Sequence, residues 1–150
     1  MYLFKDEINY TGFFFMSKRL VESGQWAGVP QATRSILPVI MKHANSNGMA
    51  FPGHQTIGVL AGLSEKSVSN GVKYISSLEG FKVVSYKTPK GNKAYKYYTP
   101  KYKGEGLIRI NESLFESGVW RELSHTAKSV YIVLRVLAVC DHWDYMFDEE

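Results

Sequence analysis

Residues 54–81 read HQTIGVLAGLSEKSVSNGVKYISSLEGF, and this stretch decides the fold. Its pattern predicts two short helices joined by a tight turn. Ile57, Leu60 and Ala61 fall on one face of the first helix. Gly62 is expected to end that helix, because glycine readily adopts a positive φ, and Leu63 then fills the corner of the turn.

The second helix is expected to begin at Ser64, whose hydroxyl can cap it. An apolar stripe follows at helical spacing and consists of Val68, Val72, Ile75 and Leu78. The residues that face outward are all polar, namely Glu65, Lys66, Ser67, Ser69, Asn70 and Lys73. Side chains of these types hydrogen-bond base edges or phosphates, which favours a helix that enters a major groove. A solvated amphipathic helix is the alternative.

A lysine-rich β-hairpin is predicted to follow. From residue 81 the apolar period switches to two, so residues 81–87 and 94–99 are expected to be strands, with a loop at 88–93. Between Gly80 and Gly104 there are seven lysines and no acidic residue. Such crowding favours contact with phosphates, although lysines also protect an exposed hairpin against aggregation. The candidate phosphate contacts are Lys87, Lys90, Asn92, Lys93 and Lys96.

Residues 51–99 resemble the winged helix-turn-helix of bacterial DNA-binding proteins. The matching positions are Phe51, Pro52, Ile57, Gly62, Leu63, Ser64 and Val68. The resemblance implies a mainly α fold with a small β-hairpin (α+β), which binds double-stranded DNA. The recognition helix, residues 65–78, would enter the major groove, and the hairpin would form the wing. The helix contacts to DNA would then be Lys66, Ser67, Ser69, Asn70 and Lys73.

Two glycines depart from the family pattern. Gly58 stands where the family usually has alanine, which we expect to be harmless for packing. Gly71 lies midway along the recognition helix, where it costs about 1 kcal/mol relative to alanine. It would be useful there if another helix approached closely.

The chain also contains an internal repeat at an offset of 94 residues. The two copies align without a gap and are identical at eight positions, and the shared core pattern is LxESGxW. The first copy contributes Gly12, Leu20, Glu22, Ser23, Gly24, Trp26, Ser35 and Val39, and the second contributes Gly106, Leu114, Glu116, Ser117, Gly118, Trp120, Ser129 and Val133. Chance similarity between short helices is the alternative.

Each copy is predicted to contain a strand (13–16 and 107–110), a short helix ending at Gly24 or Gly118, and a longer helix. The first long helix is expected at 31–45, with a kink or break at Pro38. The second is expected to be capped by Ser124. Its apolar face is predicted to contain Ala127, Val130, Tyr131, Leu134, Leu137 and Ala138.

Charge divides the chain in the same way as the repeat. Residues 1–103 carry fourteen basic and five acidic side chains, whereas residues 104–150 carry four basic and nine acidic ones. We therefore expect a winged helix-turn-helix domain at 1–103. Residues 104–150 would be the beginning of a second related unit with a strand, a short helix and a long helix, and we expect this unit to be truncated.

Several functional classes find no support in the sequence. Hydrophobic residues make up 45% of the chain, which indicates a globular protein rather than a disordered one. No motif of a nucleotide-binding loop, a hydrolase or a zinc protease occurs, so no enzyme activity and no cofactor are expected. Cys140, Asp141, His142 and Asp144 lie too close together in sequence to form a convincing metal site, so none is expected. His43, His54 and His125 are interpreted as surface or capping residues, and the protein as cytoplasmic and without membrane contact.

The order of elements before the wing is similar to that in plasmid and phage replication initiators and in the N-terminal domains of primosomal DnaD-type proteins. The resemblance implies a replication initiator that binds double-stranded DNA, either as a homodimer or with other replication proteins. A winged-helix transcriptional regulator is one alternative. The other is a protein-interaction module that does not bind DNA.

Overall fold

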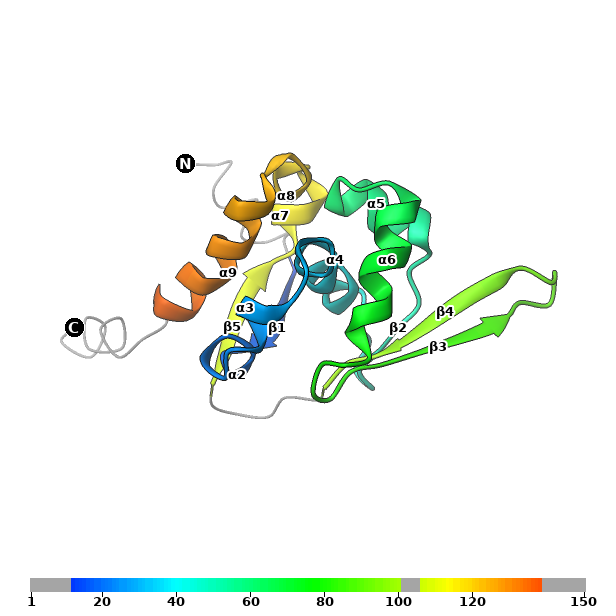
Figure 1. Cartoon of the computed structure of the whole chain (residues 1–150), viewed down its shortest axis with the longest axis horizontal. Coiled ribbons are helices and arrows are strands. Elements are labelled where there is room, and N and C mark those ends of the chain that lie inside the picture. The colour runs from blue at the N-terminus through cyan, green and yellow to red at the C-terminus, as the bar shows by residue number, and fades with distance from the viewer. Residues whose placement is uncertain (1–11, 101–105, 139–150) are drawn as a thin grey trace.

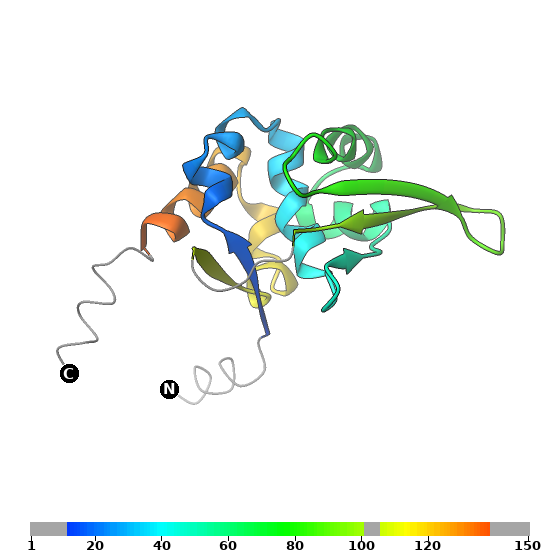
Figure 2. The same ribbon diagram turned by 90° about the horizontal axis from the view of Figure 1, so that it is seen from below.

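The computed structural model describes residues 12–100 and 106–138 and shows a mixed α/β fold with small antiparallel sheets. The described elements are β1 (Phe13–Ser17), α2 (Arg19–Glu22), α3 (Gln25–Gly28), α4 (Gln31–Lys42), β2 (Met49–Ala50), α5 (His54–Ala61), α6 (Glu65–Ile75), β3 (Lys82–Lys87), β4 (Lys93–Tyr98), β5 (Leu107–Asn111), α7 (Ser113–Glu116), α8 (Val119–Glu122) and α9 (His125–Ala138). Helix α4 lies at the centre of the fold, and the β3–β4 hairpin projects from the body (Figures 1 and 2).

The described strands form two separate sheets. Strands β2, β4 and β3 form one antiparallel sheet in that order, and β1 pairs with β5 in the other. In the second sheet, Phe15 lies opposite Arg109, and these two residues are separated by the repeat offset of 94. The two copies of the repeated strand therefore pair with each other about an approximate twofold axis.

The short helices follow the same offset. Helices α2 and α3 of the first copy correspond position by position to α7 and α8 of the second, and α4 and α9 begin at corresponding residues. Each copy has two short helices where the sequence predicted one. Gly24 and Gly118, with φ of 87° and 85°, lie between them rather than at the end of the pair.

The two tryptophans of the repeat tie the copies together reciprocally. The Trp26 indole nitrogen donates to the Ser129 carbonyl at 3.0 Å, and that of Trp120 donates to the Ser35 carbonyl at 2.9 Å. Both rings are buried, so each bond satisfies a polar group that would be costly to leave unpaired. The shared LxESGxW pattern thus carries the contact between the copies.

A second reciprocal pair involves cations at equivalent positions. Arg34 donates to the Ser129 hydroxyl at 2.8 Å, and the Lys128 ammonium lies 3.4 Å from the Ser35 hydroxyl. Lys128 is only 2% exposed, and burial lowers the pKa of its amine. It also donates to the Ala61 carbonyl at 2.6 Å, which satisfies the last turn of α5. The second copy therefore holds the helix that precedes the predicted recognition helix.

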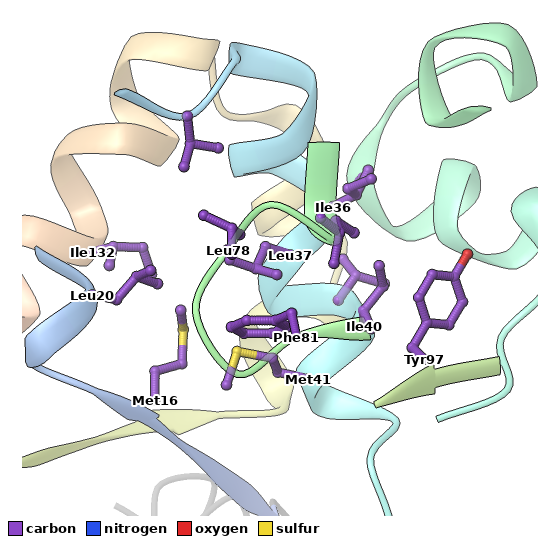
Figure 3. Close-up of a cluster of buried hydrophobic side chains, with 14 of the residues drawn as sticks. Met16, Leu20, Ile36, Leu37, Ile40, Met41, Leu78, Phe81, Tyr97 and Ile132 are labelled. Atoms are coloured by element: carbon purple, nitrogen blue, oxygen red, sulfur yellow. The ribbon is translucent and has the colours of Figure 1, made fainter. Parts of the chain in front are cut away.

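One hydrophobic cluster joins the two copies and the residues between them. Figure 3 shows side chains of α4 at its centre, with Met16 and Leu20 on one side and Tyr97 on the other. Ile36, Leu37, Val39 and Ile40 of α4 are all fully buried. Helix α4 thus supports β1 and α9 as well as α5 and α6.

The sequence predicted a kink or a break at Pro38, and the helix is not broken there. Helix α4 continues through Pro38 from Gln31 to Lys42. Pro38 is buried within the helix. Burial of the surrounding apolar side chains stabilises this helix.

The predicted apolar residues of α9 do share one face of the helix, but most of that face is exposed rather than packed on the core. Val130, Leu134 and Leu137 are 46%, 56% and 61% exposed, and the buried face instead contains Lys128, Ile132 and Val136. By the repeat, Val130 and Leu134 correspond to Ile36 and Ile40 of α4. In the first copy that side of the helix packs under α5 and α6, whereas no described element covers the same side of α9.

Glycine at residue 58 is harmless for packing, as expected, and the structure shows that it is also required. A Cβ at residue 58 would lie 2.6 Å from the Leu63 carbonyl oxygen, so the turn between α5 and α6 leaves no room for alanine. The backbone of the turn folds back over α5, and the Leu63 amide donates to the Gly58 carbonyl at 2.9 Å.

Gly71 lies at the closest approach of α4 and α6. A Cβ at residue 71 would lie 2.9 Å from Ile36 Cδ1 and 3.2 Å from the Thr33 amide nitrogen. The Thr33 hydroxyl also donates to the Gly71 carbonyl at 2.8 Å. The close approach of another helix, expected as one use of this glycine, is therefore confirmed.

We expect Gly71→Ala to lower the free energy of unfolding by about 1–3 kcal/mol, because the added methyl overpacks this crossing. In an unhindered helix the same change would stabilise by about 1 kcal/mol. Urea unfolding would measure the difference. Gly28→Ala is the matched control, since a Cβ there meets nothing within 4 Å. Wild-type stability in Gly71→Ala would contradict the close crossing.

Candidate nucleic-acid interface

The turn between α5 and α6 has the predicted geometry. Gly62 adopts a φ of 74°, and Ser64 caps α6 by accepting a hydrogen bond from the Ser67 amide at 3.2 Å. The last carbonyl of α5 is held from outside by Lys128. These contacts orient α6 relative to the rest of the fold.

The exposed face of α6 carries most of the predicted helix contacts. Lys66, Asn70 and Lys73 are exposed and spaced at about one helical turn, so they lie along one line of the helix. Ser69 lies on the flank that faces the hairpin. Ser67 lies elsewhere, because its hydroxyl accepts from the Ser64 hydroxyl at the cap. The structure therefore groups four of the five predicted residues.

Period-two alternation gives the β3–β4 hairpin two faces, which we call the inner and outer faces. The inner face, which is turned toward α6, carries Val83, Ser85, Lys87, Lys93, Tyr95 and Tyr97. Lys87 and Lys93 lie directly opposite each other across the strands. Like charges in that arrangement destabilise a hairpin, and a bound anion would relieve the repulsion.

A groove of about 300 Å³ lies between α6 and the inner face. Its polar lining from α6 consists of Ser69, Lys73 and Ser76, and its polar lining from the hairpin includes Ser85 and Lys93. The groove is thus lined by serine and lysine side chains from two separate elements. Such a set can bind an anion with several hydrogen bonds at once.

Lys93 is the predicted wing residue that lines this groove, and the other four, including Lys87 of the inner face, do not. Lys90 and Asn92 are exposed at the tip of the hairpin, where the Thr88 amide donates to the Asn92 carbonyl at 2.8 Å. Lys96 belongs to the outer face, with its ammonium 5.7 Å from the centre of the Phe51 ring. The three tyrosines of β4 also occupy different places: Tyr97 is in the core, Tyr95 lines the groove and Tyr98 is on the outer face.

His54 is a groove residue that the sequence interpretation missed. It begins α5 and stacks on Tyr95, with ring centroids 4.3 Å apart. Burial lowers the pKa of His54, Glu65 raises it and Lys93 lowers it. Its Nε2 atom is buried without a hydrogen-bond partner. The sequence around His54 did not indicate this role, because its stacking partner Tyr95 lies 41 residues away.

The other two histidines have local hydrogen bonds. His43 Nδ1 lies 2.8 Å from the Val39 carbonyl, and His125 Nδ1 lies 3.3 Å from the Ser35 hydroxyl. His125 therefore contributes to the contact between the repeat copies rather than to the groove.

Basic charge gathers on the first part of the described chain. Residues 12–100 carry eleven basic side chains (lysine or arginine) and three glutamates. Residues 106–138 carry four basic side chains and three glutamates. The acidic excess expected for 104–150 thus falls on residues outside the described part, as do Cys140, Asp141, His142 and Asp144. Within the described residues, no three His, Cys, Asp or Glu side chains gather as metal ligands. No helix there has the length and apolar character needed to cross a bilayer.

No family model, curated protein or solved structure matches the chain. The groove and the exposed face of α6 are therefore interpreted from their own geometry and charge.

The lowered pKa of His54 makes a prediction about acid stability. Because the folded state disfavours protonation of His54, the unfolded chain takes up a proton first as the pH falls below 6.5, the usual pKa. The contribution of neutral His54 to stability is therefore present at higher pH and lost on acidification. We expect the stability advantage of wild type over His54→Phe to shrink between about pH 7.5 and pH 5.5. Thermal unfolding across that range measures it, and a constant difference would contradict the assignment.

Proposed function

We propose that residues 49–98 form a winged helix that binds double-stranded DNA. The observation that carries this proposal is the groove in which Lys73 of α6 and Lys93 of the hairpin face the same space. In the proposed complex, α6 enters the major groove and the hairpin lies along the flanking backbone. The hairpin projects far enough from the body to reach past the helix (Figure 1).

Phosphates would bind at the lysines of the inner face and the tip. Lys87 and Lys93 repel each other across the strands, and Lys90 is exposed between them. Neutralising phosphates releases condensed counterions from the DNA, which favours association most at low salt. This release of counterions contributes to affinity for DNA of any sequence.

Base recognition would come from the exposed line of α6. Asn70 lies at its middle, between Lys66 and Lys73. An asparagine amide can donate to and accept from the major-groove edge of adenine, whereas a lysine pairs with guanine or with phosphates. Asn70 is thus the residue best suited to choose a base.

We propose the biological role of a replication initiator, on the resemblance in element order described above. A transcriptional regulator would use the same interface. A cytoplasmic location agrees with either role and is part of the proposal.

A protein-interaction module is a second candidate, favoured by one observation. The apolar stripe of Val130, Leu134 and Leu137 on α9 is exposed in the described structure. Exposed apolar stripes of this kind mark contacts with other proteins. This role is compatible with DNA binding, because α9 lies on the opposite side of α4 from α6 (Figure 1).

We expect the double variant Lys73→Ala/Lys93→Ala to weaken binding to all duplexes. The slope of the logarithm of the binding constant against the logarithm of salt concentration should fall by about one unit for each phosphate that the protein no longer neutralises. Fluorescence anisotropy with a random duplex measures both quantities. Lys82→Ala/Lys96→Ala removes the same charge from the outer face and should leave the slope near the wild-type value. Equal slopes in wild type and Lys73→Ala/Lys93→Ala would refute the inner-face contact.

Asn70→Ala should change sequence preference rather than general affinity. Sites selected from a random duplex library with wild type and with Asn70→Ala are expected to differ at one or two adjacent positions, with a loss of about 1–3 kcal/mol for the preferred base. Affinity for random duplex should stay near that of wild type. Identical selected sites would exclude Asn70 as a base-reading residue.

A further inference from the structure

The outer face of the hairpin carries a second set of aromatic and basic side chains. Across the strands, Lys82 lies opposite Tyr98, and Tyr86 lies opposite Ala94. Lys96 is on the same face, between Tyr98 and Ala94 along β4. Strand β2 adds a third row, because Met49 pairs with Tyr98 and Phe51 follows two residues later on the same side. The outer face therefore spans three strands.

Two of its aromatic rings are unusually open to solvent. Phe51 is 50% exposed and Tyr86 is 41% exposed, although neighbouring apolar residues of the same sheet, such as Tyr97, are buried. An exposed phenyl ring contributes little to folding, and its contact with water is unfavourable. Rings held on the rigid surface of a sheet are, however, suited to stacking against a flat ligand.

The lysines of the outer face lie over the rings of Phe51 and Tyr98 rather than beside carboxylates. The Lys96 ammonium lies 5.7 Å from the Phe51 ring centre and 5.9 Å from that of Tyr98, and Lys82 lies 5.8 Å from Tyr98. Neither lysine forms an ion pair with a described carboxylate. An exposed cation–π contact is weak and the lysine stem is flexible, so each ammonium can move to a phosphate and free a ring face.

We infer that the outer face of the hairpin binds single-stranded DNA. Unpaired bases stack on Phe51 and Tyr86, and Lys82 and Lys96 bind the phosphates of the same strand. Stacking on exposed aromatic rings within a basic surface is the general way in which proteins hold single strands without sequence preference. A duplex would not use the rings, because its bases are already stacked on one another.

This site is separate from the proposed duplex interface. Lys93 and Tyr95 face the groove beside α6, whereas Lys96 and Tyr98 alternate with them and face the other way. One hairpin therefore presents a face for phosphates of a duplex and a face for unpaired bases. The inference stands on the outer face alone and does not require that the groove bind DNA.

The test is a fluorescence anisotropy titration with labelled oligo-dT of about twelve nucleotides, a length within the usual site size. We expect wild type to bind it and Phe51→Ala/Tyr86→Ala to bind it about tenfold more weakly or worse, with random-duplex affinity unchanged. Phe13→Ala/Phe15→Ala is the matched control, because both rings are 47% exposed on the other sheet. Lys82→Ala/Lys96→Ala is a second variant, which removes the phosphate contacts and leaves the two most exposed rings.

Retention of oligo-dT binding by Lys73→Ala/Lys93→Ala would further support a separate site, whatever happens to duplex binding. Failure of wild type to bind oligo-dT would overturn the inference and leave the duplex proposal standing if duplex still binds. Wild-type affinity in both outer-face variants would also overturn it. Tighter binding to oligo-rU than to oligo-dT would overturn the assignment to DNA.

Discussion

Helix α6 can lie close to α4 because residue 71 carries no side chain. Helix α6 packs on α4 at a distance that leaves no room for a Cβ, with Ile36 and the backbone of α4 in the way. The Thr33 hydroxyl fixes the same crossing through the Gly71 carbonyl. Because α6 lies this close to α4, its opposite face, with Lys66, Asn70 and Lys73, is left to solvent. The hairpin then packs beside α6 and closes the groove.

The repeat supplies the second support. Trp26 and Trp120 each donate across the contact between the copies, and the two copies of the strand pair around Phe15 and Arg109. Lys128 extends this contact to the end of α5. The contact between the copies is therefore joined to the helix that precedes α6 by a direct hydrogen bond. In the exposed stripe on α9, Val130 and Leu134 correspond to residues of α4 that α5 and α6 cover in the first copy.

Local rules predicted much of this from the sequence. The positive φ of Gly62, the cap at Ser64 and the two hairpin strands depend on residues within a few positions of one another. The exposure of the apolar face of α9 was not foreseen, because helical periodicity shows that a helix has an apolar stripe without showing what covers it.

The two faces of the hairpin were predictable only in part. Alternation separates Lys93 from Lys96, yet all wing lysines were assigned to one partner, because the position of α6 relative to the hairpin is a tertiary property. His54 was missed for the same reason, since only the tertiary fold places Tyr95 next to it. Buried Lys128 likewise gave no local signal, because its acceptors lie 67 and 93 residues away.

The central claim is that α6 and the inner face of the hairpin form one duplex-binding surface. Its most direct test is a titration of the ¹⁵N-labelled protein with a random-sequence DNA duplex, followed by amide chemical shifts. We expect the largest shifts to fall on α6 between Lys66 and Lys73 and on the hairpin between Lys87 and Lys93, in the same concentration range. Shifts confined to α9 or to the β1–β5 sheet, or none at saturating duplex, would contradict it.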